Sequence, residues 1–350
     1  MSLLEQRLIN QHLAEGTQLK SAAVVVRELV AVQSQDHLGA KWSLGQRVNG
    51  GTEAAIDKAF DQGKFLRTHV LRPTWHYVLP DDIRWLQMLT APRVHRLMAS
   101  MNRKLDLDAK TMTRGATAIT RALEDGTHRT REELGTVLQR ARIVASTVRL
   151  AHLTAYAELE GLICSGRMKG KQHTYALVAE RAPRARVLAR DEALAELVER
   201  FMVGHAPVTL RHFCWWSGLP QRDARAGLAE VRDRLHCEKI DGVEWWYGPK
   251  GPPRGRAPGA YLIPEYDEAI TGSKDLGHFD LPWVISRKGW TDAFTRPVII
   301  DGKRAGVWRR RIENRKVEFD FKLFAKIGSK QKRALDDAVR RYTQYSAMSQ

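Results

Sequence analysis

The chain has 350 residues and a formal net charge of +17 at pH 7, with a sequence pI near 10.0. Its hydrophobic fraction of 43% is large enough for a folded core, which excludes a wholly disordered protein. The excess of Lys and Arg favours a polyanionic partner, although a soluble basic protein without such a partner has the same composition.

Cysteine usage and the N-terminus indicate a reducing compartment. Cys164, Cys214 and Cys237 are far apart and odd in number, so we expect neither a disulfide framework nor a zinc ribbon. The N-terminus lacks the basic and apolar regions of a signal peptide, and no run approaches the roughly 18 apolar residues of a membrane span. We therefore expect a cytoplasmic, nucleoid-associated protein that does not bind a membrane.

The N-terminal third has the element order of a winged helix, in which three helices precede a hairpin. The pattern Ser2-x-x-Glu5 is typical of a capping box at a helix start. Helices are predicted over residues 2–15, 21–32 and 53–61, and strands over residues 65–70 and 75–79. The second helix should end in a loop at Gln33-Ser34-Gln35-Asp36.

The same order recurs twice. The second copy is predicted to hold helices at residues 111–125, 130–140 and 147–162 and a basic hairpin at 167–175. The third copy has helices at residues 191–203, 209–217 and 220–232 and a strand at 244–247. A short turn at Gly218-Leu219, followed by Pro220 at the start of the next helix, is typical of a helix-turn-helix.

The C-terminal part is rich in strands. A linker of Gly, Pro and Arg covers residues 249–258. Beyond it we predict a hairpin over residues 297–308 with an Asp301-Gly302 turn, a strand over 317–323 and a basic helix over 330–341.

Two glutamines, Gln33 and Gln35, leave the second predicted helix together. Their ordinary role would be to satisfy backbone groups of the loop. The functional alternative is that they hold a water molecule, because an amide can orient a nucleophile without removing its proton. Asp36 can act as a base, as the N-cap of a following helix or as a salt-bridge partner.

The first hairpin carries Arg67, His69, Arg72 and His76. Strand alternation places Arg67 and His69 on the face opposite the inward residues, which predicts either a phosphate-contacting surface or an ordinary solvated face. No third ligand lies near the two histidines, so we do not expect a metal site there.

Further basic residues lie on the other two copies. The tip of the second hairpin is either a phosphate contact or a generic exposed turn. Trp215 and Trp216 are expected in the core rather than as platforms for base stacking. The candidate DNA contacts outside the first hairpin are Arg167, Lys169, Lys171, Arg211, Arg222 and Arg225.

Taken together, several segments resemble the AlkZ/YcaQ-type winged-helix DNA glycosylases. They are Ala31-Val32-Gln33-Ser34-Gln35-Asp36, Ala40-Lys41-Trp42-Ser43-Leu44-Gly45, residues 67–78, residues 161–166, Trp215-Trp216-Ser217-Gly218-Leu219, residues 262–268 and residues 301–308. One departure follows Glu268, where residues 269–276 replace the aromatic or large apolar residue and Tyr-Lys-Asp-Arg run often found in the family. That departure bears on the range of lesions that the resemblance implies, in particular on the unhooking of interstrand crosslinks, which some members of the family perform.

The resemblance implies an α+β fold class: three tandem winged-helix (helix-turn-helix) motifs with a C-terminal β-barrel-like lobe. The corresponding domains are residues 1–100 with the Gln-x-Gln loop, 101–185, 186–250 and the β-rich lobe 259–350. It also implies that Gln33 and Gln35 are catalytic, with possible electrostatic assistance from Asp36, and that the reaction is monofunctional excision of N-alkylated purines from duplex DNA.

Two other readings remain open. One is a non-catalytic winged-helix DNA-binding protein or transcription regulator, and the other is a scaffold whose basic surface binds RNA. No phosphate loop, HExxH or nucleophile-elbow motif is present, which leaves a nucleotide-dependent enzyme unsupported. We expect a monomer that needs no metal or organic cofactor and whose partner is duplex DNA, in particular alkylated DNA.

Overall fold

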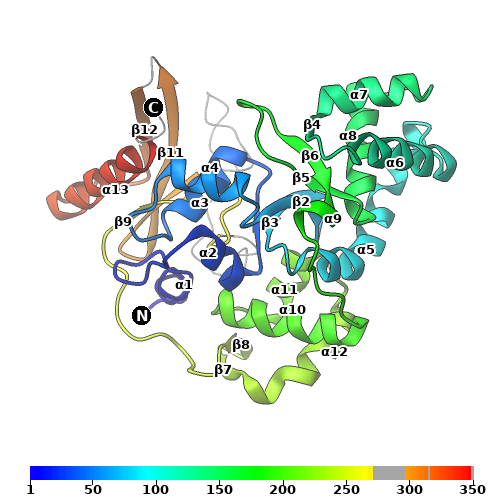
Figure 1. Cartoon of the computed structure of the whole chain (residues 1–350). Helices are drawn as coiled ribbons and strands as arrows, with labels where there is room; N and C mark the ends of the chain where they lie inside the picture. Colours follow the sequence, from blue (N-terminus) through cyan, green and yellow to red (C-terminus); the bar gives the residue numbers. More distant parts are fainter. Residues whose placement is uncertain (271–295, 314–315, 348–350) are drawn as a thin grey trace. The chain divides into compact units, whose positions relative to one another are not determined.

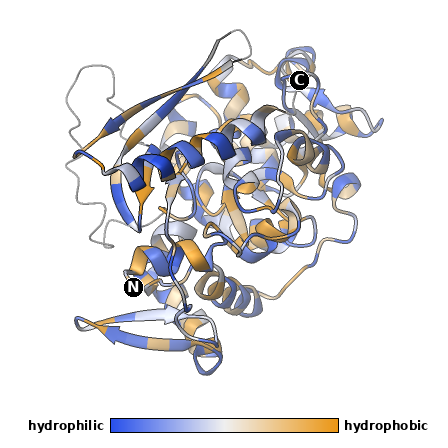
Figure 2. Cartoon of the chain, turned by 90° about the vertical axis from the view of Figure 1, so that its left-hand side faces the viewer, coloured by the Kyte–Doolittle hydropathy of each residue, from blue (hydrophilic) through white to orange (hydrophobic). Residues whose placement is uncertain are grey.

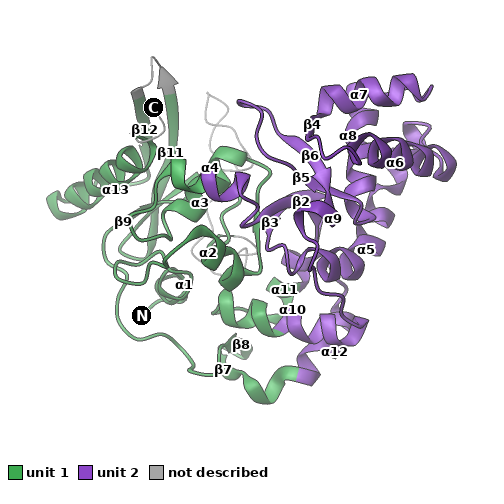
Figure 3. Cartoon of the chain, in the orientation of Figure 1, with its two compact units in different colours: residues 1–56, 199–213, 231–350 green, residues 57–198, 214–230 purple. Residues whose placement is uncertain are grey.

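The computed structural model describes residues 1–270, 296–313 and 316–347 and has a mixed α and β fold (Figure 1). The chain divides into two compact units, which are described separately (Figure 3). Unit 1 holds residues 1–56, 199–213 and 231–350, and unit 2 holds residues 57–198 and 214–230. The four consecutive domains expected from the sequence, and their three winged helices, remain predictions. Residues 271–276, where the chain departs from the family pattern, lie outside the described residues.

The N-terminal part of unit 1 confirms the starts of the first two predicted helices and shortens both, since the first ends at Asn10 and not at residue 15. The capping box of Ser2 and Glu5 is present at the first helix. Val30 has a φ of 65°, which a right-handed helix cannot accommodate, so the second helix ends at Leu29 and the chain continues as a short strand. The elements are α1 (Leu3–Asn10), α2 (Ala22–Leu29), β1 (Ala31–Gln33), α3 (His37–Gly45) and α4 (Glu53–Asp61), the last of which continues into unit 2.

Helix α3 was not predicted from the sequence. Its residues Gly39–Gly45 are all buried, so the helix has no polar face and gives no amphipathic period. The aromatic ring of Trp42 packs on Tyr342 and Tyr345 with centroid distances of 4.7 and 5.0 Å. Most other helices alternate hydrophilic and hydrophobic stretches, as amphipathic helices do (Figure 2).

A four-stranded antiparallel sheet forms the strand-rich part of unit 1, in the order β12-β11-β10-β9. Asp301 and Gly302 have φ values of 51° and 71°, as a type I′ turn requires, so the predicted hairpin is confirmed. The sheet is curled, as half of a barrel would be. The elements are β9 (Ala260–Leu262), β10 (Arg296–Ile300), β11 (Lys303–Glu313), β12 (Lys316–Leu323) and the closing helix α13 (Ser329–Ala347).

Helices α10 (Arg190–Gly204) and α11 (Leu210–Ser217) each begin in one unit and end in the other, and the hairpin of β7 (His236–Ile240) and β8 (Val243–Tyr247) belongs to unit 1. Trp245 and Tyr247 of β8 pack with Ala206 in a small cluster. The predicted strand at residues 244–247 is therefore confirmed, and β7 is its unpredicted partner.

Unit 2 is built around helices α6, α7 and α8. Their buried residues, among them Ile119, Leu134 and Leu153, form one apolar cluster that Tyr175 of β6 joins. Helix α5 has 22 residues and contains Pro92, a residue that ordinarily marks a helix boundary. The elements are β2 (Leu66–Val70), β3 (Thr74–Val78), α5 (Ile83–Lys104), α6 (Ala109–Leu123), β4 (Arg129–Thr130), α7 (Arg131–Arg140), α8 (Thr147–Leu159), β5 (Ile163–Ser165), β6 (Thr174–Leu177), α9 (Val178–Arg181) and α12 (Gln221–Val231).

Among the described helices, none is both long and apolar enough to cross a membrane.

Candidate functional site

The Gln-Ser-Gln motif lies at the end of β1 in unit 1. Gln33 is the last strand residue and is 7% exposed, whereas Gln35 is exposed. The backbone N–H of Gln33 donates a 2.8 Å hydrogen bond to Oε1 of Glu268. The motif is therefore held through its backbone at one end and presents Gln35 to solvent at the other.

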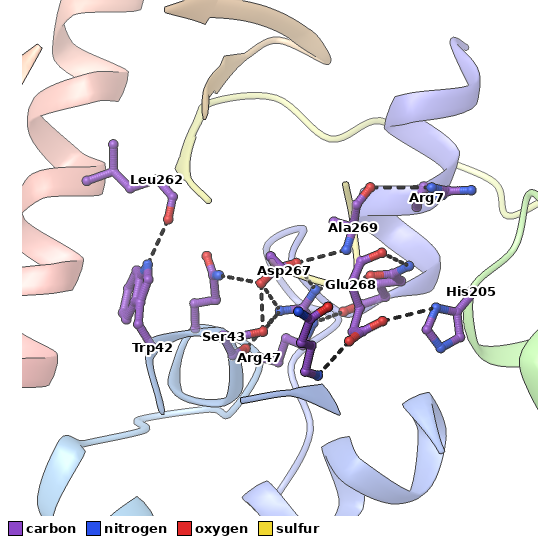
Figure 4. Close-up of polar contacts among 12 residues, drawn as sticks. Arg7, Trp42, Ser43, Arg47, His205, Leu262, Asp267, Glu268 and Ala269 are labelled. Atoms are coloured by element: carbon purple, nitrogen blue, oxygen red, sulfur yellow. Dashed lines mark hydrogen bonds and ion pairs between the residues drawn. The ribbon is translucent and has the colours of Figure 1, made fainter. Parts of the chain in front are cut away.

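Glu268 is a buried carboxylate, 1% exposed. Its own carbonyl oxygen accepts a hydrogen bond from the side-chain amide of Gln11 at 3.3 Å. Arg7 is also buried and donates to the carbonyl oxygen of Pro207 at 2.7 Å. It also donates to the carbonyl oxygen of Ala269 at 3.4 Å (Figure 4). Burial lowers the pKa of Arg7 to about 10, while the negative charge of Glu268 raises it, so Arg7 remains a cation at neutral pH.

His205 faces the second oxygen of the same carboxylate, with Nδ1 lying 3.8 Å from Oε2 of Glu268. Its Nε2 lies 2.9 Å from the carbonyl oxygen of Leu29, which can only accept, so Nε2 carries the proton. Burial lowers the pKa of His205 to about 3. The positive charges of Arg7 and Arg47 lower it further, whereas the hydrogen bond to Leu29 raises it. His205 is therefore neutral at pH 7, and its contact with Glu268 is not an ion pair.

A fully buried ion pair fixes the segment that carries Glu268. Nη2 and Nη1 of Arg47 donate to the two carboxylate oxygens of Asp267 at 2.7 and 2.9 Å, and both side chains are completely buried. The Ser43 hydroxyl and the Ala269 backbone N–H also donate to this carboxylate, at 2.7 and 2.8 Å. Burial raises the pKa of Asp267, but the charge and hydrogen bonds of Arg47 and the other donors outweigh burial and lower it.

Asp36 is a salt-bridge partner, which was one of the three roles expected for it. It occupies the N-cap position of α3 without a side-chain capping bond. Its Oδ2 lies 3.2 Å from Nη2 of Arg296, which is also 3.6 Å from Oε2 of Glu265. Gly39 permits this placement, because a Cβ atom there would lie 2.7 Å from the same carboxylate oxygen.

The hairpin of β2 and β3 in unit 2 is buried on both faces, which corrects the expected exposed face. Arg67, His69 and His76 are 9%, 5% and 0% exposed. Nδ1 of His69 lies 2.5 Å from Oε2 of Glu158, and the Arg67 guanidinium stacks 4.2 Å from the ring of Trp75. The hairpin is covered because α5, α8 and β5 pack against β2.

The two neighbouring tryptophans differ in burial. Trp216 is 1% exposed, as expected for a core residue, whereas Trp215 is 51% exposed. The Arg72 guanidinium, half-buried in the turn between β2 and β3, stacks 4.4 Å from the ring of Trp215.

The remaining basic candidates are exposed. Lys169, whose Nζ lies 2.5 Å from Oε1 of Glu133, belongs to the loop between β5 and β6, in which Gly170 has a φ of 61°. That loop also presents Arg167 and Lys171, while Arg222 and Arg225 lie on α12 and Arg211 on α11. The structure thus places Gln33, Gln35 and Asp36 together in unit 1, and places the exposed basic candidates on the β5–β6 loop, α11 and α12.

Three residues around the motif were missed by sequence reasoning: Glu268, His205 and Arg296. The one available signal was the pair of acidic residues at Asp267-Glu268, which precedes the predicted C-terminal hairpin and lies within a stretch quoted for the resemblance. His205 and Arg296 stand in no recognisable motif, so only the fold identifies them.

The buried ion pair predicts a large loss of stability on truncation of one partner. Arg47→Met should lower the free energy of unfolding by about 3–5 kcal/mol, because it leaves the Asp267 carboxylate buried without its cation. The double substitution Arg47→Met with Asp267→Leu should recover most of that loss, since it removes both charges. Denaturant unfolding measures the free energy of unfolding of the single and the double variant. A value for Arg47→Met within about 1 kcal/mol of the wild type contradicts the prediction.

A second prediction concerns acid stability. Burial lowers the pKa of His212 to about 3, with the positive charges of Arg7 and Arg211 lowering it further. Like His205, it stays neutral in the folded protein but gains a proton on unfolding below its ordinary pKa of 6.5. Each of the two therefore makes the free energy of unfolding fall by about 1.4 kcal/mol per pH unit as pH drops from 6.5 toward 3. His212→Gln should flatten the measured slope by that amount between about pH 4.5 and 6, and parallel curves for variant and wild type would refute this.

Comparison with known proteins now identifies the family. The model of the family described as DNA glycosylase AlkZ-like matches residues 26–345. No curated protein matches the chain. Among solved structures, the Streptomyces sahachiroi DNA glycosylase AlkZ matches with a TM-score of 0.80 and 20% identity over 99% of this chain and 97% of that one, which shows a common fold. The chain belongs to the AlkZ-like DNA glycosylase family.

Proposed function

We propose that this protein is a monofunctional DNA repair glycosylase that hydrolyses the N-glycosidic bond of N-alkylated purines in duplex DNA. The observation that carries the proposal is the placement of Gln33 and Gln35 at the end of β1, with the Gln33 backbone held by Glu268, in a member of a DNA glycosylase family.

The chemistry requires little more than a well-placed water molecule. Alkylation at N7 or N3 gives the purine a positive charge, so the base leaves with the electrons of its bond to C1′. The enzyme must orient water toward C1′ and stabilise the oxocarbenium-like sugar. The carbonyl oxygens of Gln33 and Gln35 accept hydrogen bonds from that water. Its oxygen forms the new bond to C1′ as the neutral base departs, and one of its protons passes to solvent.

Asp36 contributes electrostatically in this proposal. Its negative charge is adjacent in sequence to Gln35 and is fixed in position by the ion pair with Arg296. A fixed carboxylate favours positive charge that develops on the sugar as the base departs. We do not assign Asp36 a proton-transfer role, because its carboxylate is already paired with Arg296.

DNA binding is proposed for the exposed cations, within three tandem winged helices. Arg167, Lys169 and Lys171 extend from one loop, a position suited to contacting phosphates. Arg222 and Arg225 on α12, and Arg211 on α11, are exposed and add further candidate contacts. The buried side chains Arg67, His69 and His76, with the half-buried Arg72, would reach DNA only after a rearrangement of the hairpin.

The first test removes an amide from the motif. Gln35→Ala should lower the single-turnover rate of 7-methylguanine excision from duplex DNA by about 100-fold or more, because the attacking water loses an orienting group. Its dissociation constant for DNA should stay nearly unchanged. Abasic sites, revealed by alkali cleavage, provide the readout.

The control is Gln62→Ala, which truncates an exposed glutamine at the end of α4. This variant should excise at the wild-type rate. Equal excision by Gln35→Ala and the wild type would rule out the proposed site. A wild-type protein that binds duplex DNA but never releases the base would support the regulator reading instead.

The second test concerns phosphate contacts. Arg167→Ala combined with Lys171→Ala should weaken DNA binding and reduce the slope of log K against log salt by about 1.8, since each phosphate contact contributes about 0.9. Lys110→Ala with Arg121→Ala, which removes two exposed cations of α6, is the matched control and should leave the slope unchanged. Equal slopes for both double variants would remove this loop from the proposed interface.

A further inference from the structure

The carboxylate of Glu268 contacts the motif from a position 235 residues further along the chain. It accepts a hydrogen bond from the backbone N–H of Gln33, so it acts on the course of the chain at the end of β1. A charged acceptor makes a stronger hydrogen bond than a carbonyl oxygen. The bond is therefore well suited to fixing the position from which Gln33 and Gln35 emerge.

Burying a carboxylate to hold a backbone N–H costs free energy, because a charged group loses its hydration. An ionised group that is 1% exposed must be compensated by nearby charge, and His205, which is neutral, supplies none. The buried cation Arg7 provides electrostatic compensation, as the effect of Glu268 on the Arg7 pKa shows. A buried acidic side chain whose oxygen accepts from the backbone of the motif therefore points to a role beyond packing.

The segment around Glu268 is itself immobilised on both sides. Asp267 is locked to Arg47 of the turn after α3, and the carbonyl oxygen of Ala269 accepts from Arg7 (Figure 4). The carbonyl oxygen of Glu268 is bound by Gln11. The carboxylate thus reaches Gln33 from a backbone that has little freedom to shift, which is what a positioning group requires.

We propose that Glu268 is a positioning residue for excision, acting through the Gln33 backbone to hold the two glutamine amides where they orient the attacking water. This proposal rests on the proposed function of Gln33 and Gln35. Because misplacement of a catalytic group by about 1 Å can lower a rate by about 100-fold, loss of the hydrogen bond should reduce the rate without reducing DNA affinity.

The test compares two substitutions. Glu268→Ala removes the acceptor, and we expect its single-turnover rate of 7-methylguanine excision to fall by about 10- to 100-fold with an unchanged dissociation constant for duplex DNA. Glu268→Gln keeps an oxygen acceptor for Gln33, and its amide nitrogen would face the unprotonated Nδ1 of His205, which accepts a hydrogen bond. We expect the excision rate of this variant to stay within about threefold of the wild-type rate, because positioning requires a hydrogen-bond acceptor and does not require a negative charge.

A second readout does not depend on activity. Hydrogen exchange of a peptide that covers residues 31–36 should accelerate in Glu268→Ala and remain slow in Glu268→Gln. The matched control is Asp82→Ala, which removes a buried carboxylate of unit 2 that pairs with Arg186. That variant can lose stability, but its exchange in residues 31–36 and its excision rate at a temperature where it is folded should match the wild type.

The outcomes separate this inference from the proposed function. Wild-type excision by Glu268→Ala, with Gln35→Ala inactive, overturns the positioning role alone. Wild-type excision by Gln35→Ala overturns the proposed site itself. A rate for Glu268→Gln as low as that of Glu268→Ala also overturns the positioning role, because it would assign the effect to charge. If Glu268→Ala does not fold, Glu268→Gln decides: a rate within threefold and slow exchange support the proposal, and a tenfold loss refutes it.

Discussion

The buried pair of Arg47 and Asp267 is the constraint on which the candidate site depends. It joins the turn after α3 to a segment of the chain 220 residues away, and both side chains are completely buried. Two opposite charges without water attract strongly only when their remaining hydrogen-bonding groups are also satisfied, and here Gln11, Ser43 and Ala269 satisfy them. This pair fixes the backbone next to Glu268, and Glu268 in turn holds the end of β1 through its hydrogen bond with Gln33.

The buried charged side chains near the motif and the exposed charged side chains have different compositions. The buried groups near the motif comprise two basic side chains, Arg7 and Arg47, and two acidic ones, Asp267 and Glu268, with the neutral His205 beside Glu268. This arrangement is balanced, so it contributes little to the net charge of +17. The cations that would attract a polyanion are instead exposed, for example on the loop between β5 and β6 and on helix α12. In the proposed function, affinity for DNA and organisation of the site therefore depend on different residues.

Sequence patterns predicted the elements that have a periodic or capped signature, and failed where burial is complete. The capping box at Ser2 and the Asp301-Gly302 turn each mark a local interaction, and both are present. Helix α3 and the β2 strand are buried on all sides, so neither alternation nor a helical period reveals which face points inward. The motif itself was located by resemblance, but Glu268 and His205 are brought to it only by tertiary structure, because hydrogen bonds between distant segments leave no local pattern.

The discontinuity of unit 1 has a consequence for the protein during its synthesis. Gln33 leaves the ribosome 235 residues before Glu268, an interval of about 10–50 s at ordinary elongation rates. Throughout that interval β1 lacks its carboxylate partner and α3 lacks Asp267, so the nascent N-terminal segment carries both glutamines without the framework that orders them. The candidate site can therefore assemble only after most of the chain has been translated, and incomplete chains would hold the motif in an unorganised form.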